Sequence, residues 1–215
     1  MELYPAPWNL SGKGFIIIYK FNNNNLKQLS NYLNPGPGFE FKSGFGCIML
    51  VDYNSSNIGP YKEILFIPGK FAINGDKKYS ITKIYVSEND SVVNGRKNWA
   101  IPKELADFKF EQAGKSITQL KITHDNKLFL DAKIKEFGLR FPVSTVLLPF
   151  PLCQYQDGLF YYTKFSGVGQ GRLASIDFSY INNDLFPDVT NIKPLAAISV
   201  DNFKITFPEA RIISR

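Results

Sequence analysis

The chain has 215 residues, a mass of 24.4 kDa and 44% hydrophobic residues, which is enough for one well-formed core, and we expect a single domain over residues 1–215. Its net charge of +6 permits attraction to anions, but the basic residues are scattered singly or in pairs such as Lys77-Lys78, without a cluster or a nucleic-acid motif. We therefore expect no nucleic-acid partner, and an anionic small substrate is a simpler explanation of the charge.

The first residues do not resemble a targeting signal. Met1 to Pro7 lack both the basic region and the apolar region of a signal peptide. No later segment approaches the roughly 20 apolar residues that are needed to span a bilayer. We expect a cytoplasmic protein without a membrane partner, and the sequence leaves the oligomeric state open, a homo-oligomer included.

The first part of the chain predicts strands interrupted by one helix. β-Branched and aromatic residues predict a strand over residues 14–21. Three leucines at helical spacing then predict a short helix over residues 24–33, which ends at the Pro-Gly-Pro-Gly run of residues 35–38. Further strands are expected over residues 45–53 and 63–67.

A hairpin and a second helix follow. Asn74-Gly75 is a strong turn signal and predicts a hairpin between strands at residues 71–73 and 78–86. Ser87 is a candidate N-cap followed by acidic residues, so we expect a short helix that stops near Gly95. The segment beyond this helix is then expected to be a loop, which can aim a side chain into a cavity.

The rest of the chain predicts an antiparallel meander and further strands. Polar and apolar residues alternate on both sides of the turn signals Ala113-Gly114 and Asp125-Asn126. The run Gly167-x-Gly169-x-Gly171 lacks the spacing of a dinucleotide-binding loop, so a flexible turn or a narrow place in a sheet is expected. The predicted strands cover residues 107–112, 116–123, 127–135, 159–165, 172–180, 196–200 and 210–213. The fold class is therefore mainly β (α+β), antiparallel, with a few peripheral helices.

Cysteine and histidine chemistry has little support in the sequence. Cys47 and Cys153 are too few and too far apart for a disulfide framework, so we expect two buried thiols. His124 is the only histidine, no Cys/His metal spacing exists, and the residue is expected at the surface beside a turn. A Ser/His/Asp or Cys/His mechanism would need His124, and nothing around it resembles a nucleophile elbow. We expect neither a metal nor a cofactor.

The segment from Val93 to Ala106 contains the most informative lysine. Lys103 directly follows the apolar stretch Trp99-Ala100-Ile101-Pro102. Burial of an amine favours its neutral form, and a neutral amine is what Schiff-base formation with a carbonyl compound requires. The alternative is an ordinary solvated lysine, since almost all lysines of soluble proteins are exposed.

This segment resembles the signature of the acetoacetate decarboxylase superfamily, in which Gly-Arg-Glu is followed, after a few apolar or small residues, by Pro-Lys-Lys. Here the chain reads Gly95-Arg96-Lys97 and then Pro102-Lys103-Glu104. The resemblance implies a closed, cone-like β-barrel in which Lys103 forms the Schiff base. It also implies a second lysine that helps to keep the first one neutral, and this chain has Glu104 there. A nearby anion has the opposite effect, so Glu104 opposes the reaction if it faces Lys103, whereas burial alone must act if it points away.

A second match contains a candidate acid/base residue. Residues 59–63 read Gly-Pro-Tyr-Lys-Glu and resemble the Gly-x-Tyr-x-Glu strand of the superfamily, which implies that Glu63 transfers protons. The alternative is an exposed glutamate on a strand. The chain differs from the family at two other positions. A further glutamate that the family uses aligns with Ile48 here, and an arginine of the decarboxylases aligns with Gly12 or Lys13. These differences weaken the case for acetoacetate as the substrate and leave the superfamily resemblance intact.

The resemblance also reaches the ends of the chain. Residues 7–19 look like the opening of bacterial decarboxylase-like members, and residues 165–174 and 203–208 resemble their later strands. The Pro-Lys segment is the most specific of these matches.

The leading hypothesis from the sequence is a lyase of the decarboxylase or aldolase-dehydratase type. Lys103 would condense with the carbonyl of a small keto or oxo acid, and Glu63 would transfer protons. Arg96, if it turns inward, would hold the site or the substrate carboxylate, the alternative being a structural salt bridge. Trp99 and Tyr61 would line the pocket or else belong to the core or rim. The competing hypothesis is a degenerate barrel that binds a small ligand without turnover.

Overall fold

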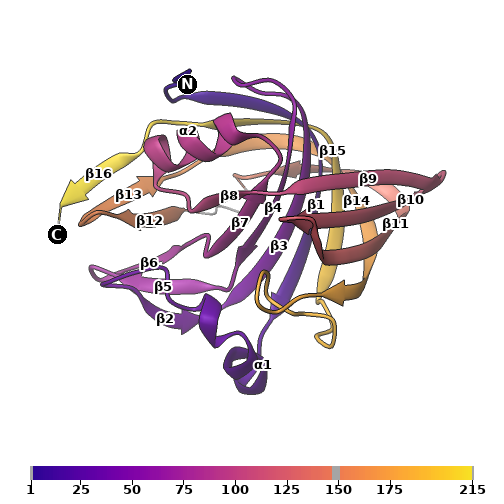
Figure 1. The fold of residues 1–215 in the computed structure, drawn as a ribbon, viewed down its shortest axis with the longest axis horizontal. Coiled ribbons are helices and arrows are strands. Elements are labelled where there is room, and N and C mark those ends of the chain that lie inside the picture. The colour runs from indigo at the N-terminus through magenta and orange to yellow at the C-terminus, as the bar shows by residue number, and fades with distance from the viewer. Residues whose placement is uncertain (1, 147–150, 215) are drawn as a thin grey trace.

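The computed structural model describes residues 2–146 and 151–214, which form two β-sheets and a few short helices (Figure 1). The expected mainly β, antiparallel fold with peripheral helices is confirmed. The helices are α1 (Asn23–Gln28), a 3-10 turn (Ser30–Tyr32) and α2 (Asn89–Trp99). The strands are β1 (Trp8–Lys20), β2 (Glu40–Ser43), β3 (Phe45–Ser55), β4 (Tyr61–Ile67), β5 (Lys70–Ile73), β6 (Asp76–Tyr79), β7 (Lys83–Val86), β8 (Lys103–Leu105), β9 (Asp107–Gly114), β10 (Ile117–His124), β11 (Lys127–Ser144), β12 (Leu152–Gln156), β13 (Leu159–Thr163), β14 (Ser166–Ile181), β15 (Ala196–Phe207) and β16 (Arg211–Ser214).

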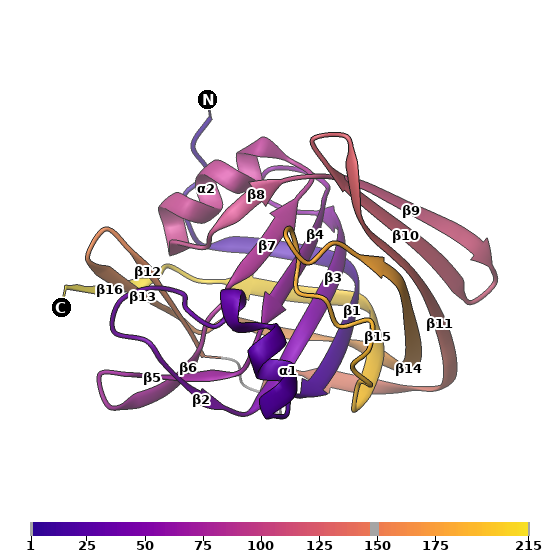
Figure 2. The ribbon, with the colours of Figure 1, turned by 60° about the horizontal axis from the view of Figure 1, so that its bottom comes forward.

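The larger sheet has ten strands in the order β8-β7-β4-β3-β1-β15-β14-β11-β10-β9, and only the β7–β8 pair is parallel. Its two edge strands are consecutive in the chain, because Ala106 alone separates Leu105 at the end of β8 from Asp107 at the start of β9. The sheet must therefore curl until its edges approach each other, as Figures 1 and 2 show. Nδ1 of His124 on β10 lies 2.9 Å from the carbonyl oxygen of Leu105 across this join. Among the described strands, no hydrogen-bond ladder joins β8 to β9, so the ten strands form a curled, half-barrel sheet whose two edge strands are linked by one residue.

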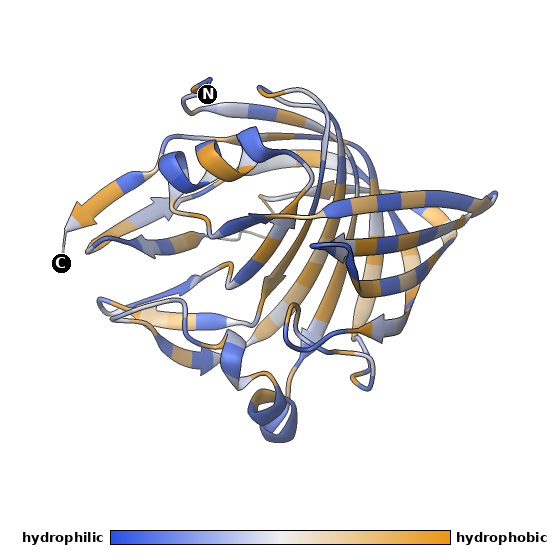
Figure 3. Cartoon of the chain, in the orientation of Figure 1, coloured by the Kyte–Doolittle hydropathy of each residue, from blue (hydrophilic) through white to orange (hydrophobic). Residues whose placement is uncertain are grey.

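The two faces of the larger sheet carry separate apolar cores, because side chains alternate between the faces along each strand. The first core takes from β3 and β4 the residues Ile48, Leu50, Ile64 and Phe66. The second core takes the alternate residues Cys47, Val51, Tyr53, Tyr61, Leu65 and Ile67. Figure 3 shows the same alternation of hydrophilic and hydrophobic residues along β9 and β10. The register of β4 therefore directs Glu63, between Tyr61 and Leu65, to the second face.

The smaller sheet has six strands in the order β16-β13-β12-β6-β5-β2 and contributes Tyr79 and Leu152 to the second core. A buried glutamine holds the crossover between the sheets. The Ser80 hydroxyl donates to Oε1 of Gln154 at 2.6 Å, the Ile81 amide donates to the same oxygen at 2.9 Å, and Nε2 of Gln154 donates to the Ile81 carbonyl at 3.0 Å.

This crossover shows that the prediction of one continuous strand over residues 78–86 was wrong. The segment contains β6 in the smaller sheet and β7 in the larger one, because Gln154 takes the backbone hydrogen bonds at the break. The hairpin expected at Asn74-Gly75 is confirmed, since both residues have positive φ (49° and 85°) and Ile73 pairs with Asp76.

The second helix also differs from the expectation. It does not stop near Gly95 but continues to Trp99, and it ends at Ala100 in the left-handed conformation with φ 53°. Glu88, and not Ser87, occupies the N-cap position, while the Ser87 hydroxyl accepts the Lys62 amide at 2.9 Å. The segment after the helix is consequently short, and Lys103 begins a strand instead of lying in a loop.

The glycine run of residues 167–171 lies inside β14. A Cβ atom at Gly169 would come within 2.5 Å of Cγ1 of Val200 on the neighbouring strand. The narrow place in a sheet is therefore confirmed, and the flexible turn is wrong.

Candidate active site

The backbone around Lys103 turns its side chain into the protein. The Lys103 amide donates to the Ile101 carbonyl at 2.8 Å, which closes a three-residue turn around Pro102 that suits the fixed φ of proline. Nε of Arg96 donates to the Lys103 carbonyl at 2.9 Å, and the residue pairs with Ile84 of β7. Lys103 is only 4% exposed as a result.

The ammonium group of Lys103 lies at the meeting point of three elements. Nζ donates to Oε2 of Glu63 on β4 at 3.0 Å and to Oγ of Ser91 on α2 at 2.9 Å. It also lies 5.2 Å from the centroid of the Tyr61 ring, within the range of a cation–π contact. Two of its three donors are therefore satisfied by side chains that are themselves buried.

Glu63 is held from its other oxygen by a tyrosine. The Tyr53 hydroxyl donates to Oε1 of Glu63 at 3.2 Å, and the Tyr53 and Tyr61 rings lie 4.5 Å apart. Burial, followed by the charge of Glu63, raises the pKa of both tyrosines well above its usual value. Both phenols therefore stay neutral, and Tyr53 remains a donor to the carboxylate.

One face of α2 is shaped around the lysine. Ser91 and Gly95 are four residues apart and lie on the same face of the helix. Ser91 accepts from Nζ, and Gly95 contacts the aliphatic part of the side chain, where an added Cβ would lie 2.6 Å from Cδ and 2.9 Å from Cε of Lys103. Gly95 therefore leaves the space that the lysine occupies.

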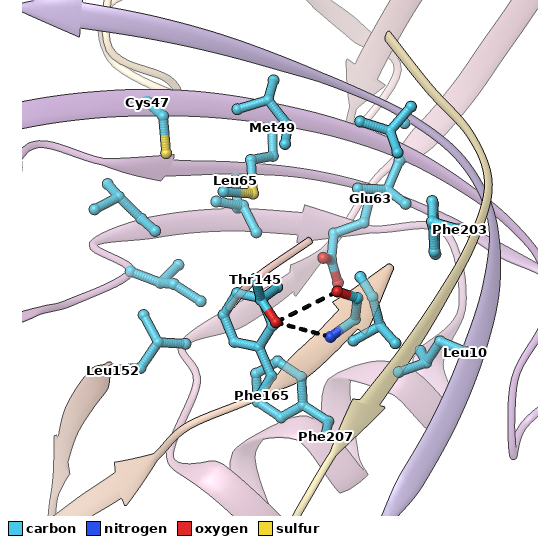
Figure 4. Close-up of a pocket in the computed structure, with 18 of the residues that line it drawn as sticks. Leu10, Cys47, Met49, Glu63, Leu65, Thr145, Leu152, Phe165, Phe203 and Phe207 are labelled. Carbon is cyan, nitrogen blue, oxygen red and sulfur yellow. Dashed lines mark hydrogen bonds between the residues drawn. The ribbon is translucent and has the colours of Figure 1, made fainter. Parts of the chain in front are cut away.

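Lys103 and Glu63 open into a cavity of about 460 Å³ between the larger sheet, α2 and the smaller sheet. Among the described residues that line it, the only charged ones are Glu63, Lys70 and Lys103, and Lys70 lies over the Tyr79 ring at 5.3 Å. The remaining wall is almost entirely apolar, and Figure 4 shows Glu63 among the side chains of Leu10, Cys47, Met49, Leu65, Leu152, Phe165, Phe203 and Phe207. An amine and a carboxylate thus share one end of a largely apolar pocket.

Glu104 does not face Lys103. Adjacent residues of β8 point to opposite faces, and Oε1 of Glu104 forms an ion pair with Nζ of Lys83 at 2.6 Å outside the pocket. Nζ of Lys83 lies 4.6 Å from the Tyr85 ring centroid. Of the two arrangements that the sequence left open, the one in which Glu104 points away is present.

The other residues suggested by the sequence divide into two groups. Tyr61 and Trp99 line the pocket, and Nε1 of Trp99 donates to the Pro208 carbonyl at 2.7 Å. Arg96 is exposed and does not line the pocket, so the inward orientation on which its substrate-binding role depended is not present. Arg96 forms a hydrogen bond with the backbone carbonyl of Lys103, and this contact is not the structural salt bridge that the sequence offered as the alternative.

The family positions that differ in this chain add no charge to the pocket. Ile48 faces the first core, and the pocket-facing residue beside it is the apolar Met49. Lys13 forms ion pairs with Glu136 and Asp201 and is absent from the lining. At Gly12 a Cβ would lie 2.1 Å from the Asp52 carbonyl oxygen, so this position is closed to a larger residue.

Sequence reasoning missed three residues of the site, which are Ser91, Gly95 and Tyr53. Gly95 was interpreted as the end of the helix, although its spacing from Ser91 places both on one helical face. Tyr53 lies opposite Tyr61 on the neighbouring strand, so the register of β3 against β4 would have found it. The two strands are consecutive in the chain, and Tyr53 and Tyr61 are only eight residues apart, but no strand pairing was assigned to these strands from the sequence.

In residues 2–146 and 151–214, no three His, Cys, Asp or Glu side chains come close enough together to hold a metal ion. Both cysteines are buried and unpaired as expected, and burial raises the pKa of the Cys47 thiol to about 12. His124 is partly buried at the β8–β10 join and not fully at the surface. Within the same residues, the helices are all too short or too polar to cross a membrane.

A comparison with protein-family models identifies the family of the chain. The model described as acetoacetate decarboxylase (ADC) matches residues 1–145, about two thirds of the sequence. The chain therefore belongs to the acetoacetate decarboxylase family. No match is found among the curated proteins.

Solved structures with the same fold cover the whole chain. Acetoacetate decarboxylase from Legionella pneumophila is 14% identical, with a TM-score of 0.72 over 100% of this chain and 90% of that one. The enduracididine biosynthesis enzyme MppR complexed with pyruvate is 15% identical, with a TM-score of 0.70 over 99% and 92%. An acetoacetate decarboxylase-like enzyme from Sphingomonas wittichii RW1 is 10% identical, with a TM-score of 0.68 over 99% and 94%. At these identities the likeness establishes the fold.

Lys103 and Glu63 should be strongly coupled in stability. Lys103→Met leaves a buried carboxylate without its cation and should lower the free energy of unfolding by about 3–5 kcal/mol. Glu63→Gln should also destabilise the protein, and the double variant should lose at least about 1 kcal/mol less than the sum of the two single changes. Urea unfolding measures all three. Lys83→Met, which removes the partner of the more exposed Glu104, is the control and should cost about 1 kcal/mol or less. Additive effects at Lys103 and Glu63 would contradict the pairing.

Gly95→Ala should displace the lysine without unfolding the protein. Alanine is favoured over glycine inside a helix by roughly 0.5–1 kcal/mol, but here its Cβ collides with the flexible end of Lys103. We expect the variant to keep its unfolding temperature within a few degrees while the reaction of Lys103 with amine reagents changes at least several-fold. Gly114→Ala, whose Cβ meets nothing closer than 3.8 Å, is the control. Unchanged reactivity of Gly95→Ala would show that the helix does not position the amine.

Proposed function

We propose that the protein is a Schiff-base-forming lyase in which Lys103 condenses with the carbonyl group of a keto or oxo acid. The observation that carries this proposal is the placement of Nζ of Lys103, 3.0 Å from a carboxylate in a largely apolar pocket. Family membership supports the same conclusion, since the neighbours in fold include decarboxylases and MppR with bound pyruvate.

The first half of the proposed reaction makes the iminium. The Lys103 ammonium transfers a proton to Glu63, and the amine nitrogen attacks the carbonyl carbon, which gives a carbinolamine. Glu63 returns the proton to the departing hydroxyl group, water leaves, and a positively charged iminium joins Nζ to the substrate. Tyr53 holds the other carboxylate oxygen of Glu63, and Ser91 holds Nζ in line during both transfers.

The second half uses the iminium as an electron sink. In a decarboxylase, the electron pair of the bond to the carboxylate carbon moves into the new carbon–carbon double bond of an enamine as carbon dioxide leaves. In an aldolase-dehydratase, a base removes a proton from the adjacent carbon and the same enamine forms. Protonation of the enamine or its addition to an aldehyde follows, and hydrolysis of the imine releases the product and restores Lys103.

The position of Glu104 determines which groups can affect the charge state of the Lys103 amine in this proposal. The resemblance implies a second cation next to the reactive lysine, and in this chain that residue pairs with Lys83 outside the pocket. Glu104 therefore neither assists nor opposes the reaction. Burial disfavours a charged amine, whereas the Glu63 carboxylate at 3.0 Å attracts the ammonium, so in this proposal Glu63 has to accept the proton before the amine can attack.

The apolar wall also suits a second candidate function, in which the barrel binds a ligand without turnover. The described lining contains no arginine to hold a substrate carboxylate, and the Lys103 ammonium is already paired with Glu63. This candidate predicts binding without covalent trapping.

Borohydride trapping separates the two candidates. Incubation with acetoacetate, pyruvate and a panel of other oxo acids, followed by reduction and intact-mass measurement, should add one substrate-sized mass to the wild type. Lys103→Ala should show no adduct, whereas Lys83→Ala, which removes an ammonium outside the pocket, should trap as the wild type does. Failure of the whole panel to form an adduct with folded wild-type protein would reject Schiff-base chemistry.

The pH profile of trapping should not depend on Glu104. Glu104→Gln removes, and Glu104→Lys reverses, a charge that faces away from the pocket. Exposed pairs of this kind contribute about 1 kcal/mol or less, so the midpoint should move by less than about 0.7 pH unit. Glu63→Gln is the contrast and should reduce trapping at every pH, because it removes the proton acceptor at 3.0 Å. A shift of a full unit or more in Glu104→Lys would show that Glu104 acts on the amine.

A further inference from the structure

The volume of the pocket exceeds that of a small keto acid. A cavity of 150 Å³ holds benzene, which has six heavy atoms, so about 460 Å³ has room for roughly 18 heavy atoms. A compound such as acetoacetate, with about seven heavy atoms, would occupy well under half of this space by the same measure. A pocket that binds its ligand well encloses most of the ligand surface, and acetoacetate alone leaves much of the apolar wall uncovered.

The Lys103–Glu63 pair and its partners form one polar region of the pocket, and the other polar residues of the described lining are Lys70, Tyr79, Ser144 and Thr145. The groups that contact Nζ of Lys103 or the Glu63 carboxylate are Ser91, Tyr53 and Tyr61. Along β4 the next pocket-facing residues after Glu63 are Leu65 and Ile67, and Ile67 lies four residues, or about 13 Å, from Glu63.

The neighbouring strand extends this apolar track. Val51, Met49 and Cys47 of β3 pair with Glu63, Leu65 and Ile67 of β4 in that order, and all three line the pocket. Figure 4 shows Glu63 on one side of the pocket, Cys47 on the other, and Met49 and Leu65 between them. Lys70, the one cation besides Lys103 among the described lining residues, is half-buried and lies over the Tyr79 ring.

We propose that the carbonyl compound bound at Lys103 carries an uncharged apolar tail of roughly ten heavy atoms, which lies along Leu65, Met49, Cys47 and Ile67. The substrate class is then a medium-chain alkyl or aryl oxo acid, whose oxo-acid head group binds beside Lys103 and Glu63. This inference rests on the proposed function only for the covalent step at the head group, since the apolar track exists whether or not the lysine reacts.

A homologous series of straight-chain methyl ketones, from butanone to undecanone, tests the tail site. Each buried methylene should strengthen binding by about fourfold until the track is filled. We expect the half-saturating concentration for borohydride trapping by the wild type to fall steadily along the series. A flat or rising half-saturating concentration beyond butanone would overturn the inference.

The same series with Lys103→Met separates this inference from the proposed function, because that variant cannot form an imine. The dependence on chain length should persist in calorimetric binding or in ligand-induced thermal stabilisation of the folded variant. If neither the oxo-acid panel nor any ketone is trapped by the wild type but binding still rises with chain length, the proposed function fails and the tail site stands. If butanone and undecanone are trapped equally well, the tail site fails and the Schiff base stands.

A variant that shortens the track gives a second readout. Cys47→Phe places a ring at the far end of the pocket, so the preference for undecanone over butanone should fall at least tenfold relative to the wild type. Leu128→Phe enlarges an exposed residue outside the pocket and is the control, for which the ratio should not change. A Cys47→Phe protein that folds and keeps the full preference would contradict the proposed position of the tail.

Discussion

The ion pair between Lys103 and Glu63 is the interaction on which the site depends, because both charges are taken out of water within a largely apolar cavity. Removing two charges from water is unfavourable unless their geometry is good and their remaining hydrogen-bonding capacity is satisfied. Here Ser91 accepts from the ammonium, Tyr53 donates to the carboxylate, and the Tyr61 ring faces the cation. The pair therefore requires β3, β4, β8 and α2 to meet at one place.

The arrangement of the chain explains how these elements meet. β4 and β3 are antiparallel neighbours whose alternation directs Glu63 and Tyr53 to the same face. β8 joins the same sheet through the parallel strand β7, and the short turn at Pro102 brings α2 directly over it. Gly95 allows the helix to approach closely enough for Ser91 to reach Nζ. A parallel edge strand and a helical glycine, which are unfavourable features in isolation, both serve this contact.

Much of this fold could be predicted from local patterns, and the exceptions have physical causes. Alternation and turn residues predicted the meander of β9 to β11 and the Asn74-Gly75 hairpin. The predicted end of α2 was wrong because the low helix propensity of Gly95 was outweighed by its packing on Lys103. The break between β6 and β7 was missed because Gln154, more than seventy residues away, takes the backbone hydrogen bonds there. The resemblance suggested Lys103 and Glu63, but the direction in which Glu104 and Arg96 point depends on strand register and helix packing that no local motif contains.

The central claim is that one lysine, held by Glu63 and Ser91, reacts with the carbonyl compound. The most direct measurement is peptide mapping by tandem mass spectrometry after borohydride reduction of the wild-type protein with its best-trapped oxo compound. The account predicts the added mass on Lys103 alone, with Lys70, the other lysine of the described pocket lining, unmodified. An adduct on Lys70 or on surface lysines, with Lys103 unmodified, would contradict it.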